Sequence, residues 1–175
     1  MDFKELIEVR RSARSYKEEQ IKDETIKEII EEALKAPSWK NSETARYYVA
    51  NTPESIEKVA AALPEFNRNS SKNAALVVTT FVRDISGFSA GVAENELSNK
   101  WGAYDLGLSN AYFILAAKEH GLDTLIMGLR DAAALRKDFG IPKNEQITSV
   151  IALGVADGPL KMRPRKAVDE VTKFL

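Results

Sequence analysis

One segment of the chain predicts the centre of its fold. Residues 74–82 have the sequence Ala-Ala-Leu-Val-Val-Thr-Thr-Phe-Val, so nearly all of their side chains are apolar or β-branched. A strand with one face in water alternates apolar and polar side chains, whereas a strand covered on both faces is apolar along its length. We therefore expect an inner strand of a sheet here, with other elements on both sides of it.

Helical and strand-like patterns alternate on either side of this segment. Apolar residues recur every three or four positions in five stretches, which predict helices at 3–10, 23–36, 53–63, 100–120 and 131–139. Short apolar runs predict further strands at 46–50, 124–127 and 146–154. This interleaved order predicts a sheet with helices on both faces. Because no repeat or linker divides residues 1–175, we expect a single domain.

Residues 84–99 have no clear periodicity. They contain Gly87, Gly91 and several polar side chains. Two interpretations remain open for this stretch, a lid-like insertion or a short mobile helix.

Composition excludes several classes of function. With 25 basic and 26 acidic residues, the formal net charge of -1 gives no overall field that would attract nucleic acid or an anionic membrane. The absence of cysteine and the single histidine leave no disulfide, thiol chemistry or credible zinc or copper site. The fingerprints G-x-G-x-x-G, G-x-x-x-x-G-K-[ST] and G-x-S-x-G are also absent.

The sequence also argues against a membrane or secreted protein. No apolar run approaches the ~20 residues that a membrane-spanning helix needs. The first residues, Met-Asp-Phe-Lys-Glu, lack the apolar stretch of a secretory signal. We therefore expect a cytoplasmic protein with neither a membrane nor a nucleic-acid partner.

Two basic clusters near the ends of the chain are the candidate binding residues for an anion. Arg10, Arg11, Ser12 and Arg14 follow the first predicted helix, and Arg163 and Arg165 flank a proline near the end. Guanidinium groups hold phosphate with several fixed donors, so arginines from both ends could bind one anion from two sides. The alternative is a solvated helix end and a solvated charged tail.

Two further segments could line a planar ligand. The loop residues Pro37, Ser38, Trp39 and Asn41 supply a hydroxyl, an indole and a carboxamide that can both donate and accept. Met127 and Gly128 end a short strand, and a glycine there would let backbone amides approach a ring. Ordinary connections between a helix and a strand are the alternative for both segments.

Four segments in this order resemble the nitroreductase family of flavin mononucleotide (FMN) enzymes. They are Arg10–Tyr16, Ala36–Ser42, Asp105–Gly128 and Arg163–Val171, and together they extend over nearly the whole chain. The resemblance implies an α+β fold, a three-layer sandwich in which helices cover a central, mostly antiparallel sheet. It also implies a homodimer with FMN at the subunit interface, held together by the helix at 100–120 and by exchanged tails at 168–175.

The same resemblance assigns a role to each candidate residue. The flavin phosphate, ribityl chain and pyrimidine edge would be contacted by Arg10, Arg11, Ser12 and Arg14, and the phosphate would also be held by Arg163 and Arg165. The partner subunit would contribute Pro37, Ser38, Trp39 and Asn41 to the flavin site. The flavin ring would be lined by Met127 and Gly128. One departure is Glu43-Thr44-Ala45, where the family commonly has Gln-Pro-Trp.

The function implied is an NAD(P)H-dependent oxidoreductase. NADH or NADPH would deliver hydride to flavin N5 and leave, and an electron-poor small-molecule acceptor, such as a nitroaromatic or a quinone, would then take its place in a ping-pong cycle. The cofactor performs the chemistry, so no side chain is required as an acid or a base, and we predict no catalytic residue and no metal. The alternative is a non-catalytic flavin-binding carrier or sensor.

Overall fold

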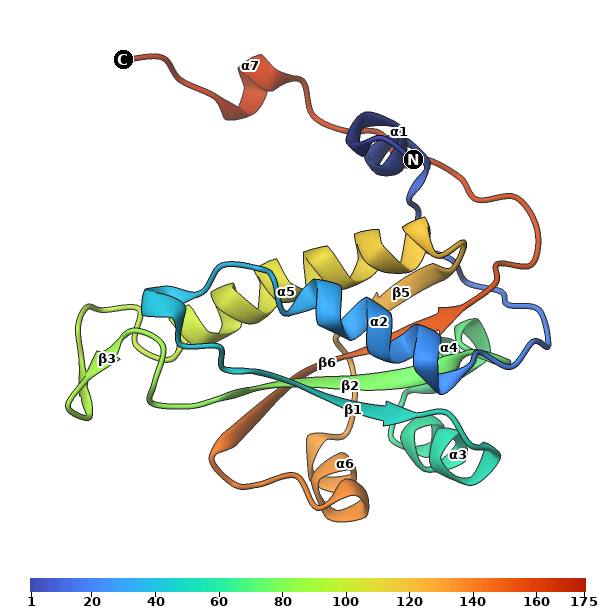
Figure 1. The fold of residues 1–175 in the computed structure, drawn as a ribbon, viewed down its shortest axis with the longest axis horizontal. Coiled ribbons are helices and arrows are strands. Elements are labelled where there is room, and N and C mark those ends of the chain that lie inside the picture. The colour runs from blue at the N-terminus through green and yellow to red at the C-terminus, as the bar shows by residue number, and fades with distance from the viewer.

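The computed structural model describes residues 1–175 and contains a four-stranded antiparallel sheet between two layers of helices (Figure 1). The strand order is β1-β2-β6-β5, formed by Ala45–Ala50, Ala75–Val82, Glu145–Gly154 and Asp123–Met127. Every neighbouring pair is antiparallel, with one register shift in β2 between Thr79 and Thr80. This confirms the α+β sandwich that the resemblance implies.

The strand predicted at the centre, β2, does lie inside the sheet and is covered on both faces. Leu76 and Val78 join a core cluster with α3 (Pro53–Ala61) and α6 (Ala132–Phe139). Val77, which points the other way, joins a second cluster with α2 (Asp23–Ala33) and α5 (Lys100–Glu119). The alternation of side chains along a strand thus fills two separate cores from one apolar segment.

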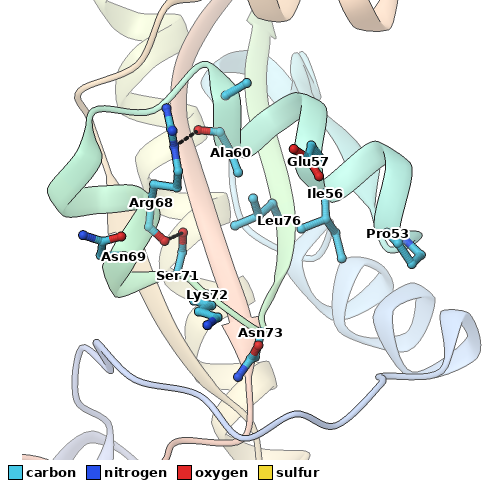
Figure 2. Close-up of a pocket in the computed structure, with 11 residues that line it drawn as sticks. Pro53, Ile56, Glu57, Ala60, Arg68, Asn69, Ser71, Lys72, Asn73 and Leu76 are labelled. Atoms are coloured by element: carbon cyan, nitrogen blue, oxygen red, sulfur yellow. Dashed lines mark hydrogen bonds between the residues drawn. The ribbon is translucent and has the colours of Figure 1, made fainter.

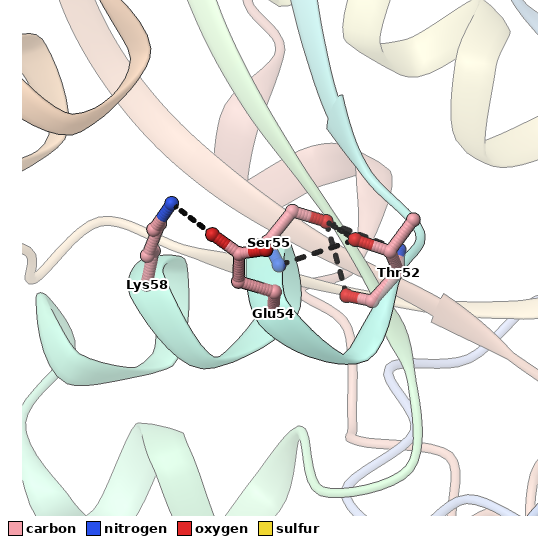
Figure 3. A network of polar contacts seen from close by, with 4 residues as sticks. All are labelled: Thr52, Glu54, Ser55 and Lys58. Carbon is pink, nitrogen blue, oxygen red and sulfur yellow. Dashed lines mark hydrogen bonds and ion pairs between the residues drawn. The ribbon is translucent and has the colours of Figure 1, made fainter.

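The helix boundaries follow capping chemistry. At the start of α3 the Thr52 hydroxyl accepts the Ser55 N–H at 3.3 Å, while the Ser55 hydroxyl accepts the Thr52 N–H at 3.0 Å (Figure 3). Pro53 occupies the first turn, where its missing N–H costs nothing. Lys58 Nζ bonds Glu54 Oε1 at 2.6 Å one turn along, which holds the pKa of Glu54 below its ordinary value.

The remaining helices are short. Helix α1 (Phe3–Val9) begins at Asp2, whose carboxylate accepts the Glu5 N–H, and lies over the C-terminal end of α5 (Figure 1). Helix α4 (Glu65–Ser70), which the sequence analysis missed, follows Pro64 directly, and α7 (Val168–Val171) lies in the C-terminal tail. No helix is long and apolar enough to cross a membrane.

The stretch 84–99 is not the short helix that was one of its two interpretations, and the lid-like insertion stays a prediction. The stretch forms a small hairpin in which β3 (Phe88–Ser89) pairs with β4 (Val92–Ala93). The turn contains Ala90 and Gly91, both with positive φ, a backbone conformation typical of tight hairpin turns. Two residues per strand are too few for an alternating pattern to be detected in the sequence.

Candidate functional site

The first basic segment runs in an extended conformation along the edge of the sheet. The Ala13 N–H donates to the Thr124 carbonyl of β5 at 3.0 Å, and the Lys17 N–H donates to the Val155 carbonyl beyond β6 at 2.9 Å. Between these bonds the Tyr16 ring is buried against Gly154, where an added Cβ would lie 2.7 Å from Tyr16 Cδ1. The backbone that carries the arginines is therefore anchored on two strands.

Arginines from both ends of the chain come close to one another. Burial, followed by the neighbouring positive charges of Arg165 and Arg11, lowers the pKa of Arg10. The ion pairs of the chain include none of the arginines of the two basic clusters. Three guanidinium groups without a carboxylate among them form a region of positive charge that suits an anion of more than one negative charge.

The other members of the two basic clusters are exposed and contact residues near them in the chain or on β5. Ser12 is exposed and bridges to Thr124, and Arg14 is exposed with Nη1 3.5 Å from the Ser12 carbonyl. Arg163 is exposed in the tail, and its carbonyl accepts a bond from Arg165 Nη1 at 3.4 Å. The structure therefore unites the N-terminal cluster with the C-terminal one.

Met127 and Gly128 lie at the far end of β5, the strand that Ser12 and Ala13 join. Met127 is buried in the core and only 2% exposed, whereas Gly128 is exposed. A Cβ added to Gly128 would meet nothing within 4 Å. Packing within the chain does not require glycine here, and the backbone is open to a ligand from outside.

The predicted loop lies elsewhere in the subunit. Trp39, Lys40 and Asn41 form a single 3₁₀ turn, η1 (Trp39–Asn41), packed on the N-terminal part of α5 (Figure 1). Pro37 and Asn41 are exposed, whereas Ser38 and Trp39 are half-buried. The arginines lie toward the other end of α5, where Met1 pairs with Glu119 at 2.7 Å. A 20-residue helix is about 30 Å long, so one subunit does not bring its loop to its own arginines.

Loop 38–43 is held by polar contacts that the sequence analysis did not predict. The buried Asp105 carboxylate accepts the Trp39 N–H at 3.0 Å and the Ser86 hydroxyl. From the hairpin, Glu94 accepts both the Trp39 indole N–H and the Lys40 ammonium group. One signal was present in the sequence, because Asp105 is the only charged residue between Lys100 and Lys118 in this helix.

One face of α5 and the tail leave apolar side chains in water. On α5, Tyr104 and Tyr112 are 59% and 43% exposed, with the exposed Gly107 between them. In the tail, Phe174 is 91% exposed, and Figure 1 shows the tail running away from the body past α1. A helix that is apolar on all sides is usually buried on all sides.

A separate hollow of about 370 Å³ lies between α3 and α4, on the other side of the sheet from α5 (Figure 2). Several of its polar groups form hydrogen bonds within the fold. Arg68 Nε donates to the Ala60 carbonyl at 3.1 Å, and the Ser71 hydroxyl donates to carbonyls of its own helix. None of the predicted site residues lines it.

Comparison with known proteins gives one family. The family model described as "Nitroreductase family" matches residues 7–155 of the chain. A Bacillus subtilis (strain 168) protein named "Putative NAD(P)H nitroreductase YdgI" is 28% identical over an alignment that covers 99% of this chain and 97% of the relative.

Solved structures show the same fold. A nitroreductase family protein from Streptococcus pneumoniae TIGR4 superposes with a TM-score of 0.88 at 19% identity, covering 99% of this chain and 100% of that chain. A protein from Exiguobacterium sibiricum 255-15, described as a putative nitroreductase in complex with FMN, superposes with a TM-score of 0.87 at 22% identity and covers 100% and 98%.

Proposed function

This chain belongs to the nitroreductase family, and from that premise we propose that it is an FMN-dependent oxidoreductase with NADH or NADPH as its hydride donor. The relative from Bacillus subtilis carries an NAD(P)H nitroreductase name, and the structure from Exiguobacterium sibiricum contains FMN. The observation that carries the proposal is that Arg165 and Arg11 lie near enough to Arg10 for their charges to lower its pKa, while none of the three arginines is in an ion pair.

The arginines of the two basic clusters have the charge and the hydrogen-bond donors that the phosphate of FMN requires. A phosphate monoester carries close to two negative charges near neutral pH and accepts several charge-assisted hydrogen bonds. Bound between the guanidinium groups, it would offset the burial and the neighbouring positive charges that lower the pKa of Arg10. We assign Arg10, Arg11, Arg163 and Arg165 to the phosphate, Ser12 and Arg14 to the rest of the cofactor, and the backbone of Met127 and Gly128 to the ring.

We propose a homodimer as the active form. Loop 38–43 lies far from the arginines of its own subunit, so Pro37, Ser38, Trp39 and Asn41 can complete the site only when a second copy supplies them. The exposed tyrosines of α5 and the apolar tail would be buried in the same interface. If the exposed face of α5 contacts the same face of a second copy, the loop reaches the partner's site and the apolar side chains are buried.

The bound flavin would supply the hydride chemistry, and the protein would supply binding and electrostatics. Arg14, placed near the pyrimidine edge, would favour negative charge there and raise the reduction potential. The open backbone at Gly128 would leave room for a flat ring. The acceptor would be an electron-poor nitroaromatic or quinone that enters after the nicotinamide leaves.

An absorption spectrum tests the proposal. The purified protein, or the protein reconstituted with FMN, is expected to show flavin bands with one FMN per subunit, and anaerobic NADH or NADPH is expected to bleach them. Adding p-nitrobenzoate or menadione should then restore the bands. A folded protein that binds no FMN contradicts the proposal. A flavin-loaded dimer that neither nicotinamide bleaches identifies the carrier or sensor alternative instead.

A further inference from the structure

Backbone strain is concentrated in two segments of the chain that contact one another. Positive φ occurs at seven non-glycine residues, and six of these lie in loop 38–43 or in the hairpin segment 84–99: Lys40, Asn41, Glu43, Asp84, Ala90 and Ser98. The left-handed region is sterically disfavoured for residues with a Cβ, and such residues persist only where their surroundings hold them. Strain of this kind gathers at functional sites, so the contacts that maintain it are informative.

The first contact is a buried carboxylate beneath the loop. Asp105 is 5% exposed, and its Oδ2 accepts the backbone N–H of Trp39 at 3.0 Å and the hydroxyl of Ser86. The Ser86 Oγ also lies 2.9 Å from the Ser42 Oγ. Asp105 and Ser86 therefore tie both ends of the 3₁₀ turn to α5 and to the base of the hairpin.

The second contact comes from the hairpin. Both carboxylate oxygens of Glu94 accept bonds from Lys40 Nζ, at 2.6 and 2.8 Å, and Oε2 accepts the Trp39 indole N–H at 3.1 Å. The Trp39 ring also packs on Trp101, with ring centroids 4.6 Å apart. One carboxylate thus restrains two neighbouring side chains of the turn, Trp39 and Lys40.

We propose that Asp105, Ser86 and Glu94 are positioning residues that hold loop 38–43 in its strained conformation for the flavin of the partner subunit. This inference rests on the proposed function, because the loop carries the residues assigned to that flavin. A loop ordered before the cofactor arrives loses less conformational entropy on binding, and this strengthens binding without any direct contact from the three residues.

The experiment compares Glu94→Gln with a matched control, Glu96→Gln. Glu96 lies two positions along the same segment, is exposed, and forms no hydrogen bond or ion pair. Both changes are made in a Trp101→Phe background, which leaves Trp39 as the only tryptophan because the chain has two. Acrylamide quenching of Trp39 emission in the FMN-free protein then reports how well the loop is held.

Glu94→Gln is expected to increase Trp39 quenching and to raise the Kd for FMN, measured by flavin fluorescence, by about three- to tenfold, as for loss of charge-assisted bonds that order a loop. Glu96→Gln should change neither quantity. The unfolding midpoint and the oligomeric state by sedimentation should match in both variants, which separates positioning from general stability. Ser86→Ala, which leaves the Asp105 carboxylate its bond to Trp39, is expected to act in the same direction.

The proposal is overturned if Glu94→Gln and Glu96→Gln have the same Kd for FMN, whether or not quenching differs. Failure of the underlying function gives a different result. In that case the parent Trp101→Phe protein and the unmodified protein would both bind no FMN. If the parent binds FMN and Glu94→Gln does not change the Kd, only the positioning role of Glu94 is contradicted, and the proposed function stands.

Discussion

At the scale of single residues, the group of arginines is an electrostatically unfavourable arrangement in the free protein. Arg10 is partly buried beside two other positive charges, and its lowered pKa reflects both conditions. Groups of this kind lower the stability of the fold and strengthen binding of an anion. Stability and ligand affinity should therefore change in opposite directions when one of these charges is removed.

Arg165→Ala tests this relation. We expect the Kd for FMN to rise about tenfold or more, as for loss of a charge-assisted bond to phosphate. The FMN-free protein should melt at the same or a slightly higher temperature in low salt. Arg83→Ala is the matched control, because Arg83 is exposed and its side chain forms no hydrogen bond. Equal affinity in the two variants would contradict the assignment of Arg165 to the phosphate.

Arg14→Ala addresses the electrostatics of the ring. Removing a positive charge near the pyrimidine edge should make the reduction potential of the bound flavin more negative. Spectroelectrochemical titration of the flavin-loaded variant measures the effect, with Arg83→Ala again as the control. An unchanged potential in a loaded Arg14→Ala protein would remove this role from Arg14.

Tyr47 makes stability depend on pH in the alkaline range. Burial raises its pKa to about 12, partly offset by its hydrogen bond with Ser109. In the unfolded chain the phenol ionises near pH 10, so the unfolded state binds fewer protons above that pH and stability falls as pH rises. Tyr47→Phe should lose less stability between pH 10 and 12 than the unmodified protein, by about 2 kcal/mol at most, in urea unfolding. Parallel curves for the variant and the unmodified protein would show that Tyr47 is not the cause.

At the scale of elements, α5 is placed by close contact with β2. A Cβ at Gly102 would lie 2.3 Å from Phe81 Cδ2, so the helix approaches the sheet where it has no side chain. We expect Gly102→Ala to destabilise the protein by about 1–3 kcal/mol through overpacking, although alanine favours a helix.

Combining Gly102→Ala with Phe81→Leu should give a smaller loss in urea unfolding than the sum of the two single changes, because the smaller side chain relieves the clash. Additive losses would show that the two residues do not meet.

The elements differ in how clearly the sequence predicts them. The cap at Thr52, the stop at Gly121 and the apolar run of β2 are local signals, and each predicted its element to within a few residues. Helix α4 and the hairpin at 84–99 were missed, because six-residue and two-residue elements are too short to show a period.

In the candidate site, too, the sequence predicted some features and not others. The arginines were proposed as site residues from their positions in the chain, and in the structure the charge of Arg165 acts on Arg10. The contacts of Asp105 and Glu94 with the loop join residues 54 to 66 positions apart, a separation at which no local pattern links them. Roles inferred from the resemblance for Pro37, Ser38, Trp39 and Asn41 stay predictions until a dimer is observed.

At the scale of the whole molecule, the proposed dimer and cofactor binding depend on each other. Gly107 lies on the exposed face of α5, and nothing within its own chain lies within 4 Å of an added Cβ. We expect Gly107→Leu to leave the subunit folded, to shift it toward the monomer in sedimentation, and to lower FMN affinity.

Ala133→Leu, on the exposed side of α6, is the control for that change. A Gly107→Leu protein that stays dimeric with unchanged FMN affinity would place the interface on another surface.

The positions of Arg10 and Arg165 also have a consequence during synthesis. A ribosome produces Arg10 before any strand of the sheet and Arg165 only after β6, the last strand of the sheet, has been made. A chain released between β6 and Arg165 would therefore complete its sheet and still lack one side of the proposed phosphate site. Yellow colour would then distinguish polypeptides that include Arg165 from those that end before it.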